Sequence, residues 1–216
     1  MENDKKIIII PAKNEEKNLS KLINSLPNYI DYLILNDYSK DNTVQILKNY
    51  KSKYLSLEDF GKKTGYDNAI NLGLEYAKKN KYDYCIIIDA DGQHPINKID
   101  IFFNELKSNQ IVVGNRNIKR LSEKIFGLTT NFIFKVKDPL CGMKAYRINI
   151  FEKIKFDDSY NIGTSYILNK SIKNIKNINI TVKKTTRKSK FGNSLVANIK
   201  IFYVLLKTII KMIFKS

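Results

Sequence analysis

Short apolar runs alternate along this chain with segments in which apolar residues recur every three or four positions. The apolar runs are residues 6–10, 31–36, 54–57, 84–88 and 111–114. The segments with helical spacing are residues 14–26, 43–50, 65–80 and 95–109. This alternation predicts an α/β fold, in which helices flank a layered, mostly parallel sheet.

Beyond Gly114 the alternation becomes irregular. The pattern there predicts a loop at residues 115–117, a helix at residues 121–135 and a compact segment at residues 138–147. No low-complexity linker or internal repeat divides the chain. We therefore expect one domain, residues 1–194, followed by a C-terminal extension, residues 195–216.

The C-terminal extension has the pattern of a basic amphipathic helix. Its longest run without a lysine is residues 201–206, far short of the roughly 20 apolar residues that span a bilayer. At about 100° per residue, its lysines share one arc of the helix: Lys200, Lys207, Lys211 and Lys215. The pattern predicts a helix lying in the plane of an anionic membrane surface. The alternative is a terminal helix packed on the domain or on a second copy of the chain.

Composition narrows the class of partner. The chain has 216 residues, is 43% hydrophobic and carries a formal charge of +17, which favours an anionic partner: a phosphate-bearing substrate, acidic lipid or nucleic acid. Cys85 and Cys141 lack the spacing of a zinc site or a disulfide framework, which fits a reducing compartment. The first residues lack the pattern of a secretory signal. We therefore expect a cytoplasmic protein.

The strongest chemical signal follows the fourth apolar run. Residues 84–88 lead directly into Asp89-Ala-Asp-Gly-Gln93. Ligands of open α/β sheets bind at the carboxyl ends of strands, and a hard divalent cation takes some oxygen ligands from protein and the rest from phosphate or water. Asp91, Gln93 and, directly or through water, Asp89 could supply those ligands. The segment predicts a metal-diphosphate site; the alternative is an acidic turn that caps the next helix.

Five segments, in order, resemble glycosyltransferase family 2. They are Ile-Pro-Ala-Lys-Asn-Glu at 10–15, Asn-Asp-Tyr-Ser-Lys-Asp-Asn-Thr at 36–43, Asp-Ala-Asp-Gly-Gln-His-Pro at 89–95, Gly-Asn-Arg at 114–116 and Asp-Pro-Leu-Cys-Gly-Met-Lys at 138–144. The chain looks like the family's dolichyl or undecaprenyl phosphate sugar transferases. Residues 189–193 resemble the basic segment that precedes the membrane-associated end of those enzymes.

The resemblance implies a GT-A fold, a nucleotide-diphosphate sugar donor, Mg²⁺ or Mn²⁺ as cofactor and inversion at the anomeric carbon. The residues that would bind the donor are Pro11, Lys13, Glu15, Asp37, Asp89, Ala90 and Asp91. Those that would hold the metal are Asp89, Asp91 and Gln93. The expected catalytic residues are Asp89, Asp91, Arg116 and Asp138. His94 is expected to position or cap its neighbours and not to act as a base.

The sequence leaves two kinds of acceptor possible, a phosphate and a hydroxyl. A polyprenyl phosphate is already ionised and needs only cations to position it. The candidates are Arg116, Arg147, Arg187 and Lys190. A hydroxyl of a lipid-linked or cell-surface glycan would instead need a carboxylate to remove its proton, and Asp138 is then the first choice. The expected location is the cytoplasmic face of a membrane, where a second copy or a membrane protein is a further candidate partner.

Other function classes explain less of the chain. A non-catalytic basic protein that binds nucleic acid or membrane would explain the charge, but it leaves the Asp89-Ala-Asp91 and Pro11–Glu15 segments without a purpose. We therefore expect no nucleic-acid partner. A sugar nucleotidylyltransferase usually carries a glycine-rich loop after its first strand, where this chain has Pro11–Glu15. The segments also depart from the family pattern, with Asn36-Asp-Tyr38 in place of two aspartates and a glycine, and Gly142-Met-Lys144 in place of Gly-Phe-Arg.

Overall fold

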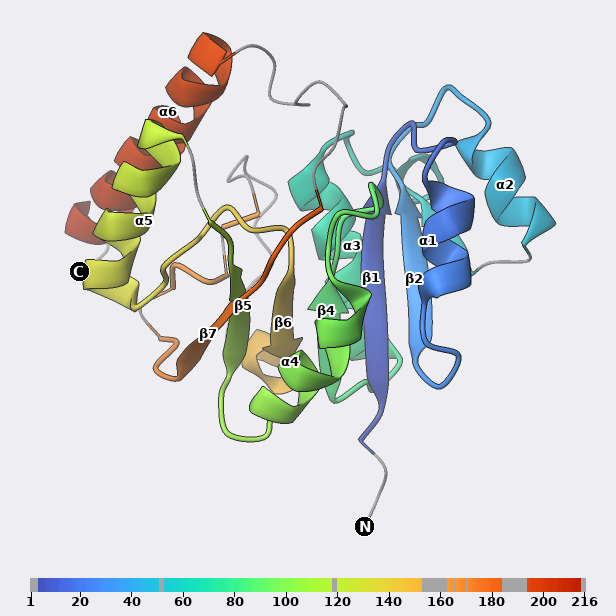
Figure 1. Cartoon of the computed structure of the whole chain (residues 1–216), viewed down its shortest axis with the longest axis horizontal. Helices are drawn as coiled ribbons and strands as arrows, with labels where there is room; N and C mark the ends of the chain where they lie inside the picture. Colours follow the sequence, from blue (N-terminus) through green and yellow to red (C-terminus); the bar gives the residue numbers. More distant parts are fainter. Residues whose placement is uncertain are drawn as a thin grey trace.

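A mixed β-sheet forms the centre of the molecule (Figure 1). The computed structural model describes residues 4–50, 53–117, 120–152, 163–164, 166–169, 171–183 and 194–214. Within these residues the sheet has seven strands in the order β3-β2-β1-β4-β6-β5-β7. The strands are β1 Lys6–Ala12, β2 Asp31–Asn36, β3 Tyr54–Ser56, β4 Tyr84–Ile87, β5 Ile111–Asn115, β6 Lys144–Arg147 and β7 Ile175–Asn179. Among them only β6 is antiparallel to its neighbours.

Helices cover both faces of this sheet. The described α-helices are α1 Leu19–Ser25, α2 Thr43–Asn49, α3 Tyr66–Lys79, α4 Ile99–Glu105, α5 Leu121–Phe134 and α6 Ser194–Phe214. The described 3-10 helices are η1 Leu57–Phe60, η2 Ile96–Lys98 and η3 Ile148–Glu152. One core cluster joins α3 and η3 to the sheet, and a second joins α1, α2 and α4 to its other face.

The first strand shows why the apolar runs were informative. Ile7 and Ile9 belong to the cluster under α3, whereas Ile8 and Ile10 belong to the opposite cluster, and all four are fully buried. A strand covered on both faces needs apolar residues throughout, so it appears in sequence as an unbroken run. Gly73 lets α3 pack closely on this strand, because a Cβ there would lie 2.5 Å from Ile9 Cγ2.

Two expectations about element boundaries were wrong. The segment from residue 14 becomes helical only at Leu19, because the preceding residues are held by the loop after β2: the Asn14 amide donates to Ser39 Oγ at 3.0 Å and the Glu15 amide to Thr43 Oγ1 at 2.8 Å. The segment from residue 95 begins with η2 and becomes α-helical at Ile99.

Strands β6 and β7 were not predicted, since β6 has four residues and β7 is a half-buried edge strand with polar positions.

The C-terminal helix packs on the rest of the molecule along one side. Phe126 of α5 forms a small core with Ile201, Val204 and Leu205 of α6, and Figure 1 shows the two helices side by side at the β7 edge of the sheet. One face of α6 therefore packs on the domain, which was the alternative expected for the C-terminal extension. In the described part of the chain, no helix combines the length and the apolar character that spanning a membrane requires.

Candidate active site

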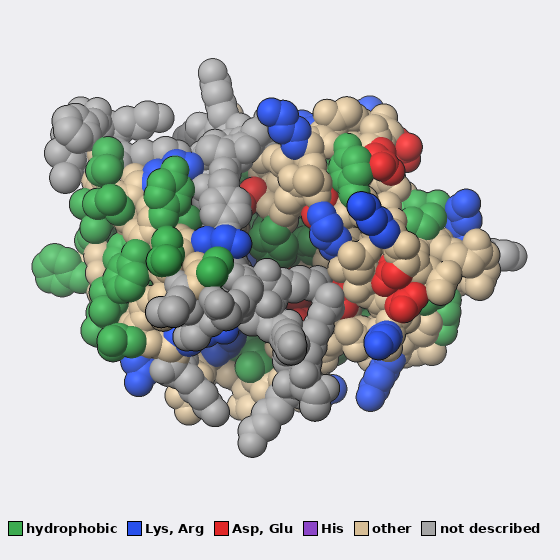
Figure 2. Space-filling view, turned by 90° about the horizontal axis from the view of Figure 1, so that it is seen from above, with side chains coloured by type: hydrophobic (Ala, Val, Ile, Leu, Met, Phe, Trp, Pro, Cys, Tyr) green, Lys and Arg blue, Asp and Glu red, His purple; other side chains and the backbone are tan. Residues whose placement is uncertain are grey.

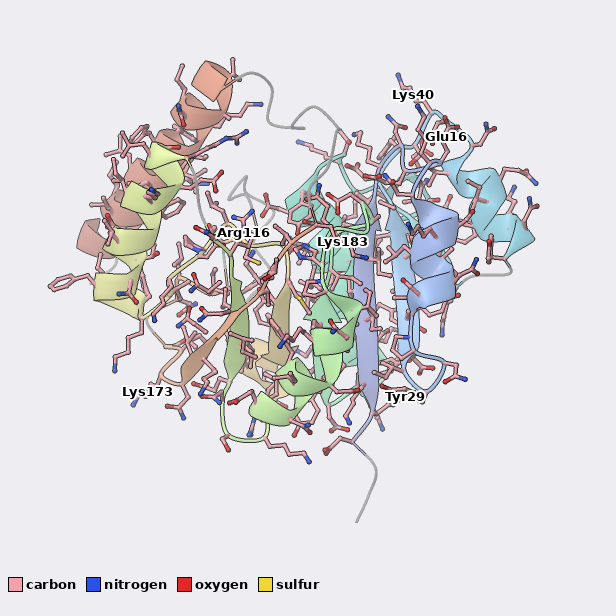
Figure 3. All side chains as sticks on the ribbon, viewed as in Figure 1. Glu16, Tyr29, Lys40, Arg116, Lys173 and Lys183 are labelled. Atoms are coloured by element: carbon pink, nitrogen blue, oxygen red, sulfur yellow. The ribbon has the colours of Figure 1, made fainter. Side chains whose placement is uncertain are left out.

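The carboxyl ends of the parallel strands gather the predicted residues at one edge of the sheet. The described residues brought to this edge are Pro11, Lys13, Glu15, Asp37, Asp89, Ala90, Asp91, Gln93, Arg116 and Asp138. Figure 3 shows Arg116 and Lys183 toward this upper edge, with Tyr29 and Lys173 toward the opposite one. The edge is therefore the candidate active site.

The loops after β1 and β2 meet at Asp37. Lys13 Nζ lies 3.4 Å from Asp37 Oδ2 and 2.5 Å from Thr64 Oγ1. Asp37 Oδ1 accepts hydrogen bonds from the Thr64 hydroxyl at 2.6 Å and from the Gly65 amide at 3.0 Å. Gly65 has φ 143°, a backbone conformation that favours glycine. The buried Asp37 carboxylate thus fixes the loop that leads into α3, as well as holding Lys13.

Two other predicted donor-binding residues lie in the first loop. Pro11 is in β1, opposite Leu35, and is partly exposed. Glu15 is buried at 1% exposure and accepts a hydrogen bond from Asn18 Nδ2 at 3.1 Å. Its negative charge also acts on Asp91. Glu15 is therefore part of the electrostatic surroundings of the acidic pair.

Asp89 is held from two sides. Its Oδ1 accepts a hydrogen bond from the Tyr66 hydroxyl at 3.0 Å, and its Oδ2 lies 3.1 Å from His94 Nε2. Burial opposes ionisation of Asp89, but the contacts with His94 and Tyr66 and the charge of Lys144 lower its pKa to about 2. Asp89 is therefore a carboxylate at neutral pH, with its orientation fixed by its neighbours.

Asp91 lies in a different environment. Asp91 Oδ1 accepts a hydrogen bond from the backbone N–H of Gln93 at 3.0 Å. The backbone carbonyl of Gln93 accepts one from the backbone N–H of Lys183 at 3.0 Å. Burial and the neighbouring Asp89 charge raise the pKa of Asp91. Ala90, between the two acids, is buried in the core. A cation beside this carboxylate pair would relieve their repulsion.

The acidic pair suits Mg²⁺ or Mn²⁺. Such ions are held in proteins by one or two carboxylates and take their other ligands from phosphate oxygens and water. Among the described residues there is no group of three or more His, Cys, Asp or Glu side chains arranged for a metal. Asp89 and Asp91 offer the two hard oxygen ligands that a substrate-bound ion needs, with Gln93 beside them.

Arg116 and Asp138 form a two-bond ion pair. Arg116 Nε lies 2.7 Å from Asp138 Oδ2, and Arg116 Nη2 lies 3.0 Å from Asp138 Oδ1. The Arg116 amide also donates to Asp138 Oδ2 at 3.1 Å. Asp138 is fully buried. Burial lowers the pKa of Arg116, but the hydrogen bonds and charge of Asp138, together with the charge of Glu123, raise it overall. Asp138 therefore holds Arg116 in place, with both carboxylate oxygens occupied.

The segment before β6 brings this ion pair to the acidic pair. A Cβ on Gly142 would lie 2.1 Å from Asp89 Oδ2, so only glycine allows the segment to pass so close. Lys144 follows it, buried at 2% exposure, and burial lowers its pKa although the negative charges of Asp89 and Asp138 act in the opposite direction. Within the described residues, the Lys144 ammonium makes neither a hydrogen bond nor an ion pair.

One predicted site residue lies elsewhere. Arg147 ends β6 and pairs with Tyr84, the first residue of β4, so the reversed direction of β6 places it at the opposite edge of the sheet. Its guanidinium donates to the carbonyls of Leu106 at 2.5 Å, Asn109 at 3.0 Å and Lys107. The prediction that Arg147 binds an acceptor phosphate at this site is therefore wrong. Arg187 and Lys190 lie outside the described residues.

Three contributors were missed at the level of sequence. Tyr66 is the first residue of α3 and Thr64 lies in the loop just before it, and nothing in their local pattern marks them. Lys144 did carry a signal, because it is a lysine inside the otherwise apolar run Met143–Tyr146. His94 was expected to be a positioning group, and its contact with Asp89 fits that role.

Curated proteins with similar sequences include several glycosyltransferases. The chain is 30% identical over 177 residues to the uncharacterized protein MJ0544 of Methanocaldococcus jannaschii. The match covers 71% of this chain and 76% of that protein. It is 30% identical to the UDP-N-acetylglucosamine--dolichyl-phosphate N-acetylglucosaminyltransferase of Methanococcus voltae, over 92% of this chain and 94% of that one. For dolichyl-phosphate beta-glucosyltransferase ALG5A of Trichomonas vaginalis the identity is 28%, over 64% of this chain and 52% of that one.

Solved structures and a family match complete the comparison. Glucosyl-3-phosphoglycerate synthase from Mycobacterium tuberculosis, solved with uridine diphosphate, superposes with a TM-score of 0.76 at 16% identity, over 95% of this chain and 80% of that one. The same protein was also solved with Mn²⁺, UDP-glucose and phosphoglyceric acid. The predicted GT-A fold is confirmed. Residues 7–175 match the family described as glycosyl transferase family 2. The chain is thus a glycosyltransferase and belongs to glycosyl transferase family 2.

Proposed function

We propose that this enzyme transfers a sugar from a nucleotide-diphosphate donor to a polyprenyl phosphate. The observation that carries the proposal is the position of the Arg116–Asp138 ion pair beside the Asp89–Asp91 carboxylates. The Asp89–Asp91 carboxylates suit a metal-bound diphosphate. The Arg116–Asp138 pair supplies a fixed arginine for the phosphate of the acceptor. The names of the relatives from Methanococcus voltae and Trichomonas vaginalis, which include dolichyl phosphate, support this acceptor class.

The donor would bind across the loops after β1, β2 and β4. Lys13 and Asp37 would contact the nucleoside end, and Asp91, with Asp89 and Gln93, would face a cation on the diphosphate. A bound Mg²⁺ or Mn²⁺ would offset the charge that collects on the nucleoside diphosphate as the glycosidic bond breaks. The contacts of Tyr66 and His94 with Asp89 would keep that carboxylate ionised and oriented during the reaction.

The acceptor phosphate would attack the anomeric carbon directly. It is ionised at neutral pH, so an oxygen lone pair forms the new bond while the nucleoside diphosphate leaves with the old bonding electrons. No proton has to be removed, and the configuration at carbon inverts. Arg116 would hold the acceptor phosphate, and Asp138 would keep the guanidinium oriented.

A glycan hydroxyl is the less favoured acceptor. Its proton would need a base within hydrogen-bond reach. Asp138, the first choice for that base, is fully buried and already accepts from Arg116 with both oxygens. The geometry therefore favours Asp138 as the residue that positions Arg116. We also place the enzyme peripherally on the cytoplasmic face of a membrane, where a polyprenyl phosphate is accessible.

Matched arginine substitutions test the acceptor site. We expect Arg116→Lys to raise the KM for polyprenyl phosphate at least 10-fold while the KM for the donor stays within about 2-fold, since lysine lacks the planar fork. Arg147→Lys is the control, because Arg147 lies at the other edge of the sheet. Equal effects of the two substitutions on the acceptor KM, or transfer only to hydroxyl acceptors, would contradict the proposal.

A further inference from the structure

Lys144 is a buried lysine in the middle of the sheet. It is the first residue of β6 and pairs with Ile87 of β4 on one side and with Val113 of β5 on the other. Ile87 and Val113 belong to the core cluster under α3, and directly paired residues of neighbouring strands point to the same face of a sheet. The Lys144 side chain therefore lies on the sheet face that α3 covers, where it is 2% exposed.

Two carboxylates act on the Lys144 ammonium from different parts of the candidate site. Asp89 follows Ile87 by two residues, and it approaches the chain two residues before Lys144, where a Cβ on Gly142 would lie 2.1 Å from Asp89 Oδ2. Asp138 belongs to the segment that leads into β6, and its charge also acts on Lys144. Lys144 thus lies between the metal side of the site and the arginine side.

Lys144 contributes charge to the site and no direct bond. Among the described residues, its ammonium forms neither a hydrogen bond nor an ion pair. Both oxygens of Asp89 and both oxygens of Asp138 already contact other side chains. Burying an ammonium without a partner also lowers the stability of a fold. The role of Lys144 is therefore electrostatic, because its field reaches both carboxylates.

The charges around Lys144 leave room for one divalent cation. Figure 2 looks onto this edge of the molecule and shows Lys and Arg side chains close to Asp and Glu side chains. Two ion pairs at the border of the site cancel: Lys13–Asp37 and Arg120–Glu123. Apart from His94, the described charges that act on the acidic pair and on Lys144 are the carboxylates of Glu15, Asp89, Asp91 and Asp138 and the cations Arg116 and Lys144. The excess of two negative charges equals the charge of one Mg²⁺ or Mn²⁺. Without Lys144 the excess would be three.

We propose that Lys144 is a positioning residue that makes the binding of the metal depend on the binding of the diphosphate. Its ammonium repels a free divalent cation from the carboxylates and attracts the anionic diphosphate. The cation then binds well only when the diphosphate brings further negative charge, and it leaves with the nucleoside diphosphate after transfer. The inference rests on the proposed function only in taking this diphosphate to be that of the sugar donor.

Separate titrations of the full chain with a cation and with an anion test this role. The probes are Mn²⁺ alone and inorganic pyrophosphate in the presence of a metal chelator, each followed by calorimetry. We expect Lys144→Met to bind Mn²⁺ about 5-fold or more tightly and pyrophosphate about 5-fold or more weakly, because one positive charge is lost. Lys144→Gln is also uncharged but differs in shape, and it should shift both affinities in the same directions. The control Lys173→Met removes an exposed lysine at the opposite edge of the sheet and should leave both affinities within about 2-fold.

The opposite signs of the two shifts separate this role from a structural one. A distorted site would bind both probes more weakly, so unchanged or weaker Mn²⁺ binding by both Lys144 variants would overturn the proposal. Loss of the folded state in both variants would overturn it as well, because the ammonium would then support the fold. Neither titration contains a polyprenyl phosphate. A failure to transfer sugar to that acceptor would therefore contradict the proposed function alone and leave the titration result standing.

Discussion

At the scale of single residues, two acids one residue apart have different surroundings. Tyr66 and His94 occupy both oxygens of Asp89, whereas Asp91 accepts a hydrogen bond from the Gln93 amide. The first arrangement keeps a carboxylate ionised and oriented. In the second, the neighbouring Asp89 charge repels the Asp91 carboxylate, and a bound cation would relieve that repulsion. Asp91 is therefore the better candidate for direct metal contact.

Substitution of Asp91 should separate metal binding from folding. We expect Asp91→Asn to lower sugar transfer at least 100-fold and to remove the Mn²⁺-dependent rise in Tm with nucleoside diphosphate, because the amide carries no charge. The control Asp59→Asn removes an exposed acid of η1 and should change neither quantity. A Mn²⁺-dependent rise that survives in Asp91→Asn would show that the ion binds elsewhere.

Lys144 should contribute to catalysis more than to stability. The buried ammonium makes neither a hydrogen bond nor an ion pair with the described residues, while its neighbours Asp89 and Asp138 have other partners. Methionine has a similar shape and no buried charge. We therefore expect Lys144→Met to keep or raise the Tm and to lower kcat/KM at least 10-fold. A fall in Tm by several degrees with kcat/KM retained would indicate a structural role.

At the scale of elements, the loop after β1 is tied to the start of α2. Asp41 Oδ1 accepts from the Thr43 amide at 3.0 Å and from its hydroxyl at 2.5 Å, and Asp41 Oδ2 accepts from the Glu16 amide at 3.1 Å. Burial opposes ionisation of Asp41, but these hydrogen bonds lower its pKa below the ordinary value. One carboxylate thereby positions two loops that border the site.

The Asp41 contacts predict a pH-dependent stability difference. The folded pKa lies below the unfolded value of about 3.9, so the ionised carboxylate stabilises the fold above that pH. The stabilisation is lost as pH falls through the folded pKa. We expect Asp41→Asn to lower the free energy of unfolding by about 1 kcal/mol at pH 7 and by less at pH 2, where more of the parent side chain is protonated. Denaturant titrations of both chains at both pH values would measure the loss of unfolding free energy. An equal loss at pH 7 and at pH 2 would contradict the role of the ionised carboxylate.

Sequence patterns predicted most of the elements and a mostly parallel sheet, but not the reversed direction of β6. Unbroken apolar runs found β1 and β4 because these strands are covered on both faces. The same pattern carries no information on whether a four-residue strand such as β6 runs parallel or antiparallel. That single reversal decides that Lys144 lies at the site and Arg147 at the opposite edge. Contacts from the start of α3, such as that of Tyr66 with Asp89, depend on tertiary packing and could not be read from spacing.

At the scale of the whole molecule, α5 and α6 form a second, smaller core beside the main domain. Val204 and Ile201 of α6 are buried against Phe126, while the outer faces of both helices stay apolar and exposed. The helix pair thus packs through one side and is exposed on the other. Sequence alone could not divide the apolar residues of α6 between these two surfaces.

Truncation of buried and exposed residues on α6 should have unequal effects. We expect Ile201→Ala to lower the free energy of unfolding by about 2–4 kcal/mol, because it leaves a cavity between the helices. Leu206→Ala changes a residue that is 58% exposed and should cost less than about 0.5 kcal/mol. Chemical denaturation of both variants would measure the difference. Similar small losses for both would contradict the packing of α6 on α5.

The most direct test of the central claim is the mass of the lipid product. The purified enzyme is incubated with a panel of nucleotide-diphosphate sugars, Mn²⁺ and a polyprenyl phosphate, and the extracted lipid is analysed by mass spectrometry. The account predicts a polyprenyl phosphate that has gained one sugar from one donor of the panel, and no such product with Asp91→Asn. It would be contradicted if the lipid phosphate stayed unmodified with every donor while a glycan hydroxyl acceptor in a parallel reaction received the sugar.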